Sequence, residues 1–240
     1  MSGHKKLELT PRLQALADWV PVGERVADIG TDHGYLPIWL LLNGICPGAI
    51  AGDLRECPLA RARQAAVDFG VQDRMDTRLC DGLSAVGPEE VSTVVIAGMG
   101  GETIAGILAA APWTADGRHT LLLQPMTRPE TLRAALASGG YRIVRERLVL
   151  DRGTLYPILD VRGGPMQLTP GQAYCGTDLS HDPLGDRYLI ERIIRVQNTI
   201  YGLRQSAVEA DRARLEENRS LLKELFEMRE AWRVANCTGN

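Results

Sequence analysis

The chain has 240 residues, a formal net charge of −3 and 45% hydrophobic residues, which is the composition of an ordinary soluble globular protein. A disordered chain is excluded, and so is a membrane protein, because no apolar run approaches the roughly 20 residues of a membrane span. The five cysteines form neither close pairs nor a dense framework, so a disulfide scaffold and a structural zinc site are not expected. The amino terminus lacks the apolar core of a signal peptide. We expect a cytoplasmic protein that binds neither a metal nor a membrane.

Short β-branched or aliphatic runs alternate with helix-like segments through the first two thirds of the chain. Most of these runs are apolar on both sides, as expected for strands that helices cover on both faces. The alternation predicts an α/β fold with a doubly wound, mostly parallel sheet. A short polar turn between the last two runs predicts that they form an antiparallel hairpin. The predicted strands are Arg25–Asp28, Ala49–Asp53, Met75–Cys80, Thr93–Ala97, His119–Gln124, Tyr141–Val149 and Thr154–Val161.

The last third of the chain has a different pattern. Residues 163–182 are rich in Gly, Pro, Ser and Thr, which is typical of a linker. Two apolar stripes at helical spacing follow, from Leu184 to Leu203 and from Leu215 to Trp232, and a polar run separates them. This pattern predicts an antiparallel helical hairpin. We therefore expect a ligand-binding domain over residues 1–162, a linker over 163–182 and a helical hairpin over 183–240.

The most informative segment is DIGTDHG, from Asp28 to Gly34. A predicted strand ends at Asp28 and a helix is expected to begin near Tyr35, so glycines lie where backbone can approach a ligand at the carboxyl end of the sheet. Two carboxylates, Asp28 and Asp32, do not suit a pyrophosphate, which prefers bare N–H groups and a positive helix end. They favour a cationic ligand with an amino-acid head group, as S-adenosylmethionine is. His33 is expected to brace this loop rather than act as a base.

Further acids follow the next strands. Asp53 can accept hydrogen bonds from ribose hydroxyls, as a similarly placed acid does with nicotinamide cofactors, and Asp81 can accept one from an adenine amino group. A single Asp at a strand end is usually a helix cap, but a series at successive strand ends favours a ligand site. The predicted cofactor-binding residues are Asp28, Gly30, Thr31, Asp32, His33, Gly34, Asp53, Leu54, Asp81, Gly82, Gly98 and Met99.

The fourth predicted strand ends in AGMGG, residues 97–101, which supplies no acid, base or nucleophile. Such a backbone wall lets a flat base approach a methyl donor, and Met99 can pack on the face of that base. Methyl transfer to a ring nitrogen needs in-line positioning and no covalent intermediate. Gln124, at the end of the fifth strand, is either a contact to the base edge or a plain polar strand end. We expect Met99, Gly100 and Gln124 to position the substrate base.

The segments LTPRLQALADWV, VADIGTDHGYLPIWLL, VVIAGMGGETIAGIL and LLLQP together resemble the bacterial tRNA (adenine-22-N1) methyltransferases, the TrmK family. The resemblance covers nearly the whole chain. It implies a Rossmann-like, seven-stranded class I methyltransferase fold with a C-terminal helical, coiled-coil-like domain. It also implies S-adenosylmethionine as cofactor and methylation of N1 of an adenine in the D-loop region of tRNA. With tRNA as the partner, we expect a monomer or a weak dimer.

Five arginines are candidate RNA contacts under this reading: Arg12, Arg187, Arg192, Arg195 and Arg204. Residues 166–240 carry ten basic and eleven acidic residues, so a salt-bridged, solvated helix face is the competing interpretation. Arg12 can serve either the tRNA or a carboxylate in the core.

Three alternatives to the tRNA methyltransferase remain on the residues alone. The chain could methylate another substrate, or it could bind the cofactor without turnover and act through its helical hairpin. An NAD oxidoreductase is disfavoured by the two acids of the glycine-rich loop, Asp28 and Asp32.

Overall fold

The computed structural model describes residues 6–205 and 209–237. The chain forms two compact units. One comprises residues up to 145 and residues 149–166, and we call it the sheet unit. The other comprises residues 146–148 and the chain from 167 onward, and we call it the helical unit.

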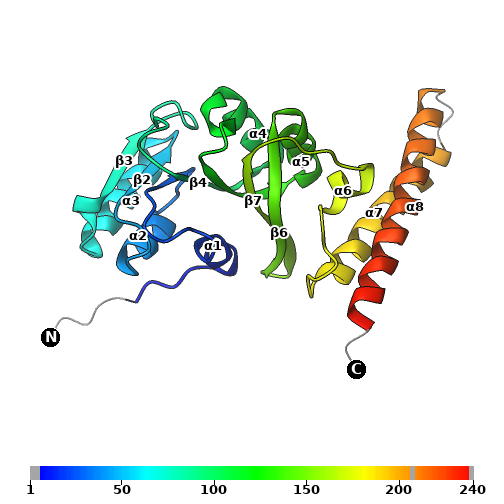
Figure 1. The fold of residues 1–240 in the computed structure, drawn as a ribbon, viewed down its shortest axis with the longest axis horizontal. Coiled ribbons are helices and arrows are strands. Elements are labelled where there is room, and N and C mark those ends of the chain that lie inside the picture. The colour runs from blue at the N-terminus through cyan, green and yellow to red at the C-terminus, as the bar shows by residue number, and fades with distance from the viewer. Residues whose placement is uncertain (1–5, 206–208, 238–240) are drawn as a thin grey trace. The chain divides into compact units, whose positions relative to one another are not determined.

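A single seven-stranded sheet confirms the predicted α/β fold, with the strand order β3-β2-β1-β4-β5-β7-β6 (Figure 1). The first five strands run parallel, and β7 is antiparallel to β5 and lies next to β6. Every predicted strand is present, and most extend by a few residues. The strands are β1 (Val26–Ile29), β2 (Ala49–Asp53), β3 (Met75–Leu79), β4 (Thr93–Gly100), β5 (Thr120–Thr127), β6 (Tyr141–Asp151) and β7 (Thr154–Gly163).

Helices cover both faces of the sheet, as the doubly apolar strands require. One core lies against α4 and α5 and includes Ile104 and Leu132, and the other lies against α1, α2 and α3 and includes Leu16, Leu40 and Ala62. The helices of this unit are α1 (Pro11–Ala17), α2 (Tyr35–Leu42), α3 (Glu56–Asp68), α4 (Gly101–Ala110) and α5 (Pro129–Ser138), with short 3₁₀ turns at Gln72–Arg74 and Pro112–Ala115.

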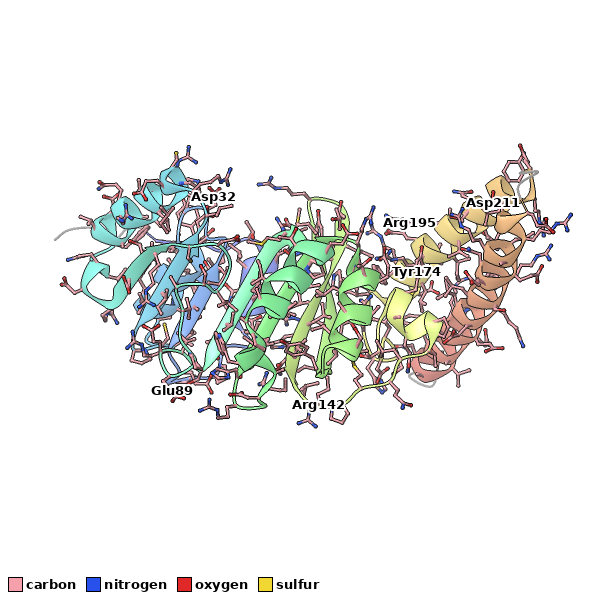
Figure 2. All side chains as sticks on the ribbon, turned by 90° about the horizontal axis from the view of Figure 1, so that it is seen from above. Asp32, Glu89, Arg142, Tyr174, Arg195 and Asp211 are labelled. Carbon is pink, nitrogen blue, oxygen red and sulfur yellow. The ribbon has the colours of Figure 1, made fainter. Side chains whose placement is uncertain are left out.

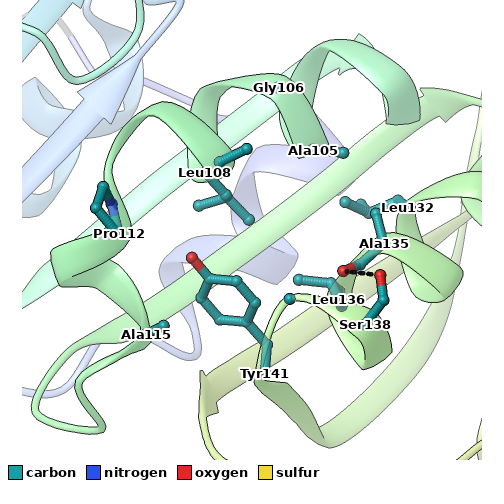
Figure 3. Close-up of a pocket in the computed structure, with 12 residues that line it drawn as sticks. Ala105, Gly106, Leu108, Pro112, Ala115, Leu132, Ala135, Leu136, Ser138 and Tyr141 are labelled. Carbon is teal, nitrogen blue, oxygen red and sulfur yellow. Dashed lines mark hydrogen bonds between the residues drawn. The ribbon is translucent and has the colours of Figure 1, made fainter.

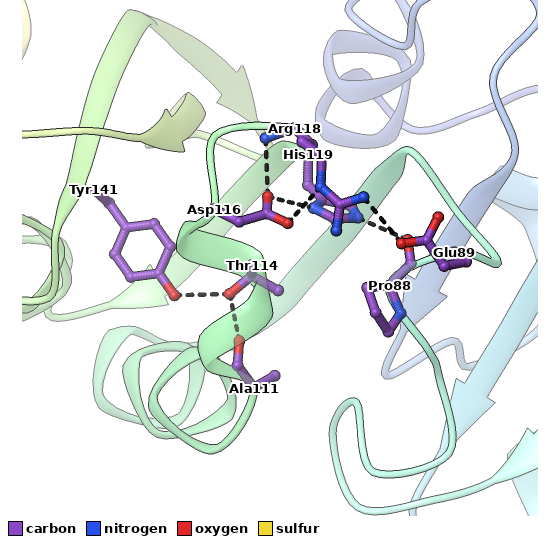
Figure 4. A network of polar contacts seen from close by, with 8 residues as sticks. All are labelled: Pro88, Glu89, Ala111, Thr114, Asp116, Arg118, His119 and Tyr141. Carbon is purple, nitrogen blue, oxygen red and sulfur yellow. Dashed lines mark hydrogen bonds and ion pairs between the residues drawn. The ribbon is translucent and has the colours of Figure 1, made fainter.

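A polar network fastens the edge of the sheet where β5 begins (Figure 4). His119 is 2% exposed, and both of its ring nitrogens face oxygen acceptors at 2.9 Å, Asp116 Oδ1 and the carbonyl of Pro88. Trp113 packs edge-on against the imidazole. The Arg118 N–H donates to Asp116 as well, and its guanidinium reaches Glu89. His119 therefore joins two loops, a structural role that no local sequence pattern indicates.

The helical unit contains α6 (Pro170–Cys175), α7 (Gly185–Arg204) and α8 (Ala210–Cys237). The segment expected to be an irregular linker therefore holds a helix, because Thr169 and Gln172 form a capping box at its start. Helices α7 and α8 pack on each other as the predicted hairpin, and Leu225 of α8 is fully buried. Among the described residues, no helix combines the length and apolar character that a membrane crossing requires.

Candidate active site

Five parallel strands end at one edge of the sheet, which we call the carboxyl edge. The register places Ile29 beside Gly52 and Ile96, so the residues that follow these three meet in space. Ala97 lies beside Gln124 in the same way. In the sheet unit of Figure 2, Asp32 lies at this edge and Glu89 at the opposite one. The predicted acids and glycines of successive strands are therefore neighbours, as a ligand site requires.

The glycine-rich turn after β1 is fixed by backbone hydrogen bonds. The N–H groups of Gly30 and Thr31 donate to the carbonyl of Gly52 at 2.8 and 3.1 Å, and the Thr31 hydroxyl accepts from the N–H of Gly34 at 3.1 Å. Gly30 has a φ of +80°, and a Cβ built there would lie 2.0 Å from the terminal methyl of Met99. The turn thus favours glycine at this position because of its backbone conformation, and any larger residue would also have to displace the Met99 side chain.

Asp28 is a buried carboxylate at the base of this turn, with only 7% of its surface exposed. Burial raises its pKa to about 6, the Thr31 hydroxyl opposes that rise, and the charge of Asp53 adds to it. Within the described part of the chain, Asp28 forms no ion pair with Lys, Arg or His. A buried anion without a cationic partner suits a ligand that brings its own cation, such as the ammonium group of S-adenosylmethionine.

Two further acids stand at the ends of β2 and β3. Asp53 is also 7% exposed, and its Oδ1 accepts the backbone N–H of Arg55 at 2.8 Å. That bond fixes the carboxylate, and no described hydrogen bond engages Oδ2, which is available to a diol. Leu54, which follows, is exposed. Asp81 and Gly82 line a hollow of about 380 Å³ between the loop after β3 and α4.

Asp32 and His33 lie further out on the loop. The Nε2 atom of His33 is 3.4 Å from Asp32 Oδ2, and its ring stacks on Tyr35 with centroids 5.1 Å apart. Arg61 approaches Asp32 from α3 at 3.8 Å. These contacts are those of a bracing residue, the role preferred for His33 from the sequence.

A β-bulge shapes the end of β4. Ala97 pairs with Gln124 and Met99 with Pro125, so Gly98 is an extra residue with no partner on β5. Gly98 has a φ of +78°, is exposed, and has no atom within 4 Å of where a Cβ would stand. The bulge turns Met99 so that its methyl lies against Gly30. In the backbone wall predicted from AGMGG, Gly98 is therefore exposed to solvent, and the Met99 side chain packs on the glycine-rich turn.

Gln124 does not have the role expected for it. Its side chain is 1% exposed, and its Oε1 accepts the N–H of Gly98 at 3.2 Å while its Nε2 donates to the carbonyl of Pro125 at 2.9 Å. An amide that is buried and bonded in this way cannot present an edge to a base. It satisfies instead the N–H that the bulge leaves unpaired.

Arg12 is likewise bound inside the sheet unit rather than presented to phosphates. Its Nε donates to Asp151 Oδ2 at 2.6 Å, and one NH group donates to Gln124 Oε1 at 3.1 Å. The guanidinium lies over the ring of Tyr156, 4.9 Å from its centroid. Of the two roles open from the sequence, the structure supports the core carboxylate.

The candidate arginines of α7 divide into two groups. Arg192 is 6% exposed, donates to the hydroxyl of Tyr188 at 2.6 Å and lies over the Tyr174 ring, so it is a core residue and the prediction of a phosphate contact is wrong. Arg187 pairs with Glu191, four residues further on the helix. Arg195 and Arg204 are exposed, and Figure 2 shows Arg195 on the helical unit.

A larger apolar cavity of about 490 Å³ lies between α4 and α5 (Figure 3). Tyr141 and Ser138 line it, but the Tyr141 hydroxyl is bonded to Thr114 and the Ser138 hydroxyl donates to backbone carbonyls. The residues that line it include no acid or base. Within the described ranges, three or more His, Cys, Asp or Glu side chains do not gather into a metal site. The chemistry-bearing groups therefore concentrate at the carboxyl edge.

Known proteins are similar to this chain over more than nine tenths of its length. A family model described as "Methyltransferase domain" matches residues 9–159. The tRNA (adenine(22)-N(1))-methyltransferase of Bacillus subtilis is 32% identical over 234 residues, 94% of this chain and 95% of that relative. The crystal structure of B. subtilis TrmK superposes with a TM-score of 0.78 at 28% identity, over 96% of this chain and 99% of that one. Streptococcus pneumoniae Sp1610 in complex with S-adenosyl-L-methionine gives 0.78 at 31% identity, over 91% and 99%. This chain belongs to the family of the bacterial tRNA (adenine(22)-N(1))-methyltransferases.

Proposed function

We propose that this chain transfers a methyl group from S-adenosylmethionine to N1 of an adenine in the D-loop region of tRNA. Its membership of the methyltransferase family carries the reaction class and the cofactor. The observation on this chain that supports the proposal best is Asp28, a buried carboxylate at the glycine-rich turn that no described ion pair neutralises.

The acids of the carboxyl edge fit the cofactor group by group. Asp28 suits the ammonium of the methionine part, Asp53 suits the ribose hydroxyls through its Oδ2, and Asp81 suits the adenine amino group. When bound, S-adenosylmethionine supplies an electrophilic methyl group on a sulfonium, which becomes a neutral thioether as N1 of the substrate takes the methyl group and the positive charge. Thr31 and the carbonyl of Gly52 hold the turn in shape before any ligand enters.

The wall at Gly98–Gly101 suits the substrate base. Because the substrate adenine takes a positive charge and loses no proton at N1, the chain need not supply a base there. The wall offers only backbone and the Met99 thioether, which agrees with a reaction whose rate depends on positioning and on exclusion of water from the nitrogen lone pair. Gly100 is the N-cap residue of α4, so the wall leads directly into that helix.

The tRNA would contact exposed arginines of the helical unit under this proposal. Arg195 and Arg204 are exposed on α7, and no described ion pair involves them. Arg187 is half exposed, so its surface pair with Glu191 is weak and can be exchanged for a phosphate. We assign residues 183–240 to RNA binding and residues 1–162 to the reaction.

Methylation of unmodified bulk tRNA with methyl-labelled S-adenosylmethionine, followed by nucleoside mass spectrometry, tests the proposal. We expect 1-methyladenosine from the wild type and none from Asp53→Ala. Label in another nucleoside would show that the chain methylates a different base. Absence of label, with cofactor binding confirmed by calorimetry, would favour a binding module that does not turn over.

A further inference from the structure

We propose that Arg12 is a positioning residue for methyl transfer, which holds the Gly98 bulge in the shape that receives the substrate base. The inference rests on the proposed function, because it takes the bulge as the place of the base. It gives Arg12 a task different from a phosphate contact. A chain of contacts leads from α1 to the bulge.

The first contact fixes the guanidinium. Arg12 stands in the first turn of α1, after the N-cap Thr10 and Pro11, and α1 packs on β5 and β7. Its Nε donates to Asp151 Oδ2 at 2.6 Å, and Asp151 is buried at the end of β6. The Tyr156 ring of β7 supports the guanidinium at 4.9 Å. Three elements thus hold one side chain, which leaves it little freedom to move.

The second contact fixes the side chain of Gln124. One NH group of Arg12 donates to Gln124 Oε1 at 3.1 Å. The same oxygen accepts the N–H of Gly98 at 3.2 Å, and the amide nitrogen donates to the carbonyl of Pro125. Both hydrogen bonds to Oε1 require the amide in one orientation, so the position of Arg12 determines where Gly98 can lie.

The third contact fixes the backbone of the wall at Gly98. Gly98 is the extra residue of the bulge, and its N–H donates to the side chain of Gln124 instead of a backbone carbonyl of β5. Bulges beside active sites serve to re-aim side chains, and here the bulge directs the Met99 methyl against Gly30. Without the bond that the Gly98 N–H donates to Gln124, the glycine backbone is less restricted, and we expect the wall to lose its fixed shape.

Stability alone does not account for this arrangement. A partly buried ion pair such as Arg12–Asp151 adds little net stability, because desolvation of the charges offsets their attraction. Geometry, in contrast, matters directly to methyl transfer, since a displacement of about 1 Å can lower the rate about 100-fold. We therefore expect loss of the Arg12 contacts to affect kcat more than binding.

The chain contains a matched control in Arg145. Its guanidinium lies over the Trp19 ring at 4.4 Å, and its Nε donates to the buried Asp160 at 2.9 Å. Like Arg12, Arg145 therefore combines a buried aspartate with an aromatic ring, although it is more exposed and Asp160 also pairs with Arg162. No described hydrogen bond joins Arg145 to Gln124 or Gly98. Arg145→Gln should therefore lower stability without lowering kcat.

The test compares Arg12→Gln/Asp151→Asn, which removes both buried charges together, with Gln124→Met and Arg145→Gln. We expect kcat for tRNA methylation to fall about 10- to 100-fold in the first two variants. The KM for tRNA and the Kd for S-adenosylmethionine should stay within about threefold of the wild type, and Arg145→Gln should keep its kcat. Gln124→Glu, which restores an acceptor for both donors, should recover much of the rate. If the double variant does not fold, Gln124→Met decides the question alone.

Two results would overturn the proposal. One is a wild-type kcat in Gln124→Met or in the folded double variant. The other is a loss confined to the KM for tRNA, with a salt dependence of log KM that flattens by about one, which would make Arg12 a phosphate contact. Hydrogen exchange of the Gly98 amide, measured by NMR without tRNA, should be faster in the double variant. That readout tests the Arg12 contacts even if the wild type methylates no tRNA, so failure of the proposed function and failure of this inference can be distinguished.

Discussion

The pKa values of Asp28, at the carboxyl edge of the sheet, and Asp116, at the opposite edge, are shifted in opposite directions. Burial raises the pKa of Asp28 to about 6, whereas the Arg118 backbone N–H, His119 and the Arg118 side chain hold the pKa of Asp116 at about 2. All partners of Asp116 belong to the protein. The hydrogen-bond partners of Asp28 leave its charge uncompensated. A buried charged group that is fully hydrogen-bonded or paired by the protein has a structural role. A buried charge that the protein leaves unpaired indicates a site for a ligand.

The largest effect is expected from removal of the uncompensated charge. Asp28→Asn should weaken S-adenosylmethionine binding at least about 100-fold, because the ligand's ammonium group loses the buried carboxylate assigned to it. The unfolding free energy of the ligand-free protein should not fall, since a buried carboxylate without a cation is unfavourable. Calorimetry and thermal unfolding measure both quantities. Asp76→Asn, at an exposed pair with Arg78, is the control and should leave affinity unchanged. Equal affinities in the two variants would refute the role of Asp28.

The titration of Asp28 gives a smaller effect on the same site. The cation needs an ionised Asp28, so cofactor affinity should fall about tenfold between pH 7.5 and pH 5 as the carboxyl protonates through its pKa of about 6. The stability of the ligand-free protein changes with pH in the opposite direction and decreases as pH rises. The stabilisation from a neutral Asp28 is complete below its unfolded value of 3.8 and is lost as pH rises through 6. Cofactor Kd and unfolding midpoint, each measured across this pH range, check the two signs. A flat affinity profile, equal to that of Asp28→Asn, would contradict the assignment.

The sequence predicts the carboxyl edge well, because local signals determine it. Strands apolar on both sides, the glycines after β1 and the helix that begins at Tyr35 lie in one short stretch of chain. Parallel pairing then brings Asp28, Asp53 and Asp81 to one edge. The capping box of α6 is also a local signal, which a reading of residues 163–182 by composition alone passes over.

The remaining parts of the site depend on contacts between distant residues. Arg12 reaches Gln124 and Asp151 across sequence separations of 112 and 139 residues, and no local pattern indicates either contact. The position of Gln124 at the end of a strand predicts either a contact to the base edge or a plain polar strand end, and only the bulge at Gly98 shows why its side chain turns inward. The burial of Arg192 also depends on a distant residue, because Tyr174 of α6 packs against its guanidinium.

The helical unit offers a comparison of two arginines three residues apart. Arg195→Glu should raise the KM for tRNA about three- to fivefold at low salt, because an exposed positive charge is reversed, and should leave the unfolding midpoint unchanged. Arg192→Met should instead lower the midpoint, because the Tyr188 hydroxyl loses its partner. Steady-state kinetics at two salt concentrations, with thermal unfolding, separate the two effects. If Arg195→Glu leaves the KM unchanged, α7 does not contact tRNA at this position.

The smallest effect on activity is expected at the edge of the sheet where β5 begins. His119→Phe keeps the shape of the buried ring but leaves the Pro88 carbonyl without a donor, which should cost about 1–3 kcal/mol of unfolding free energy. Arg118→Gln, whose pair with Glu89 is exposed, should cost less than about 1 kcal/mol and is the control. Neither variant touches the carboxyl edge, so both should keep the wild-type kcat below their unfolding midpoints. A fall in kcat for His119→Phe at full foldedness would show that the two edges are coupled, because the strands between them would then transmit a local loss of packing to the Gly98 bulge.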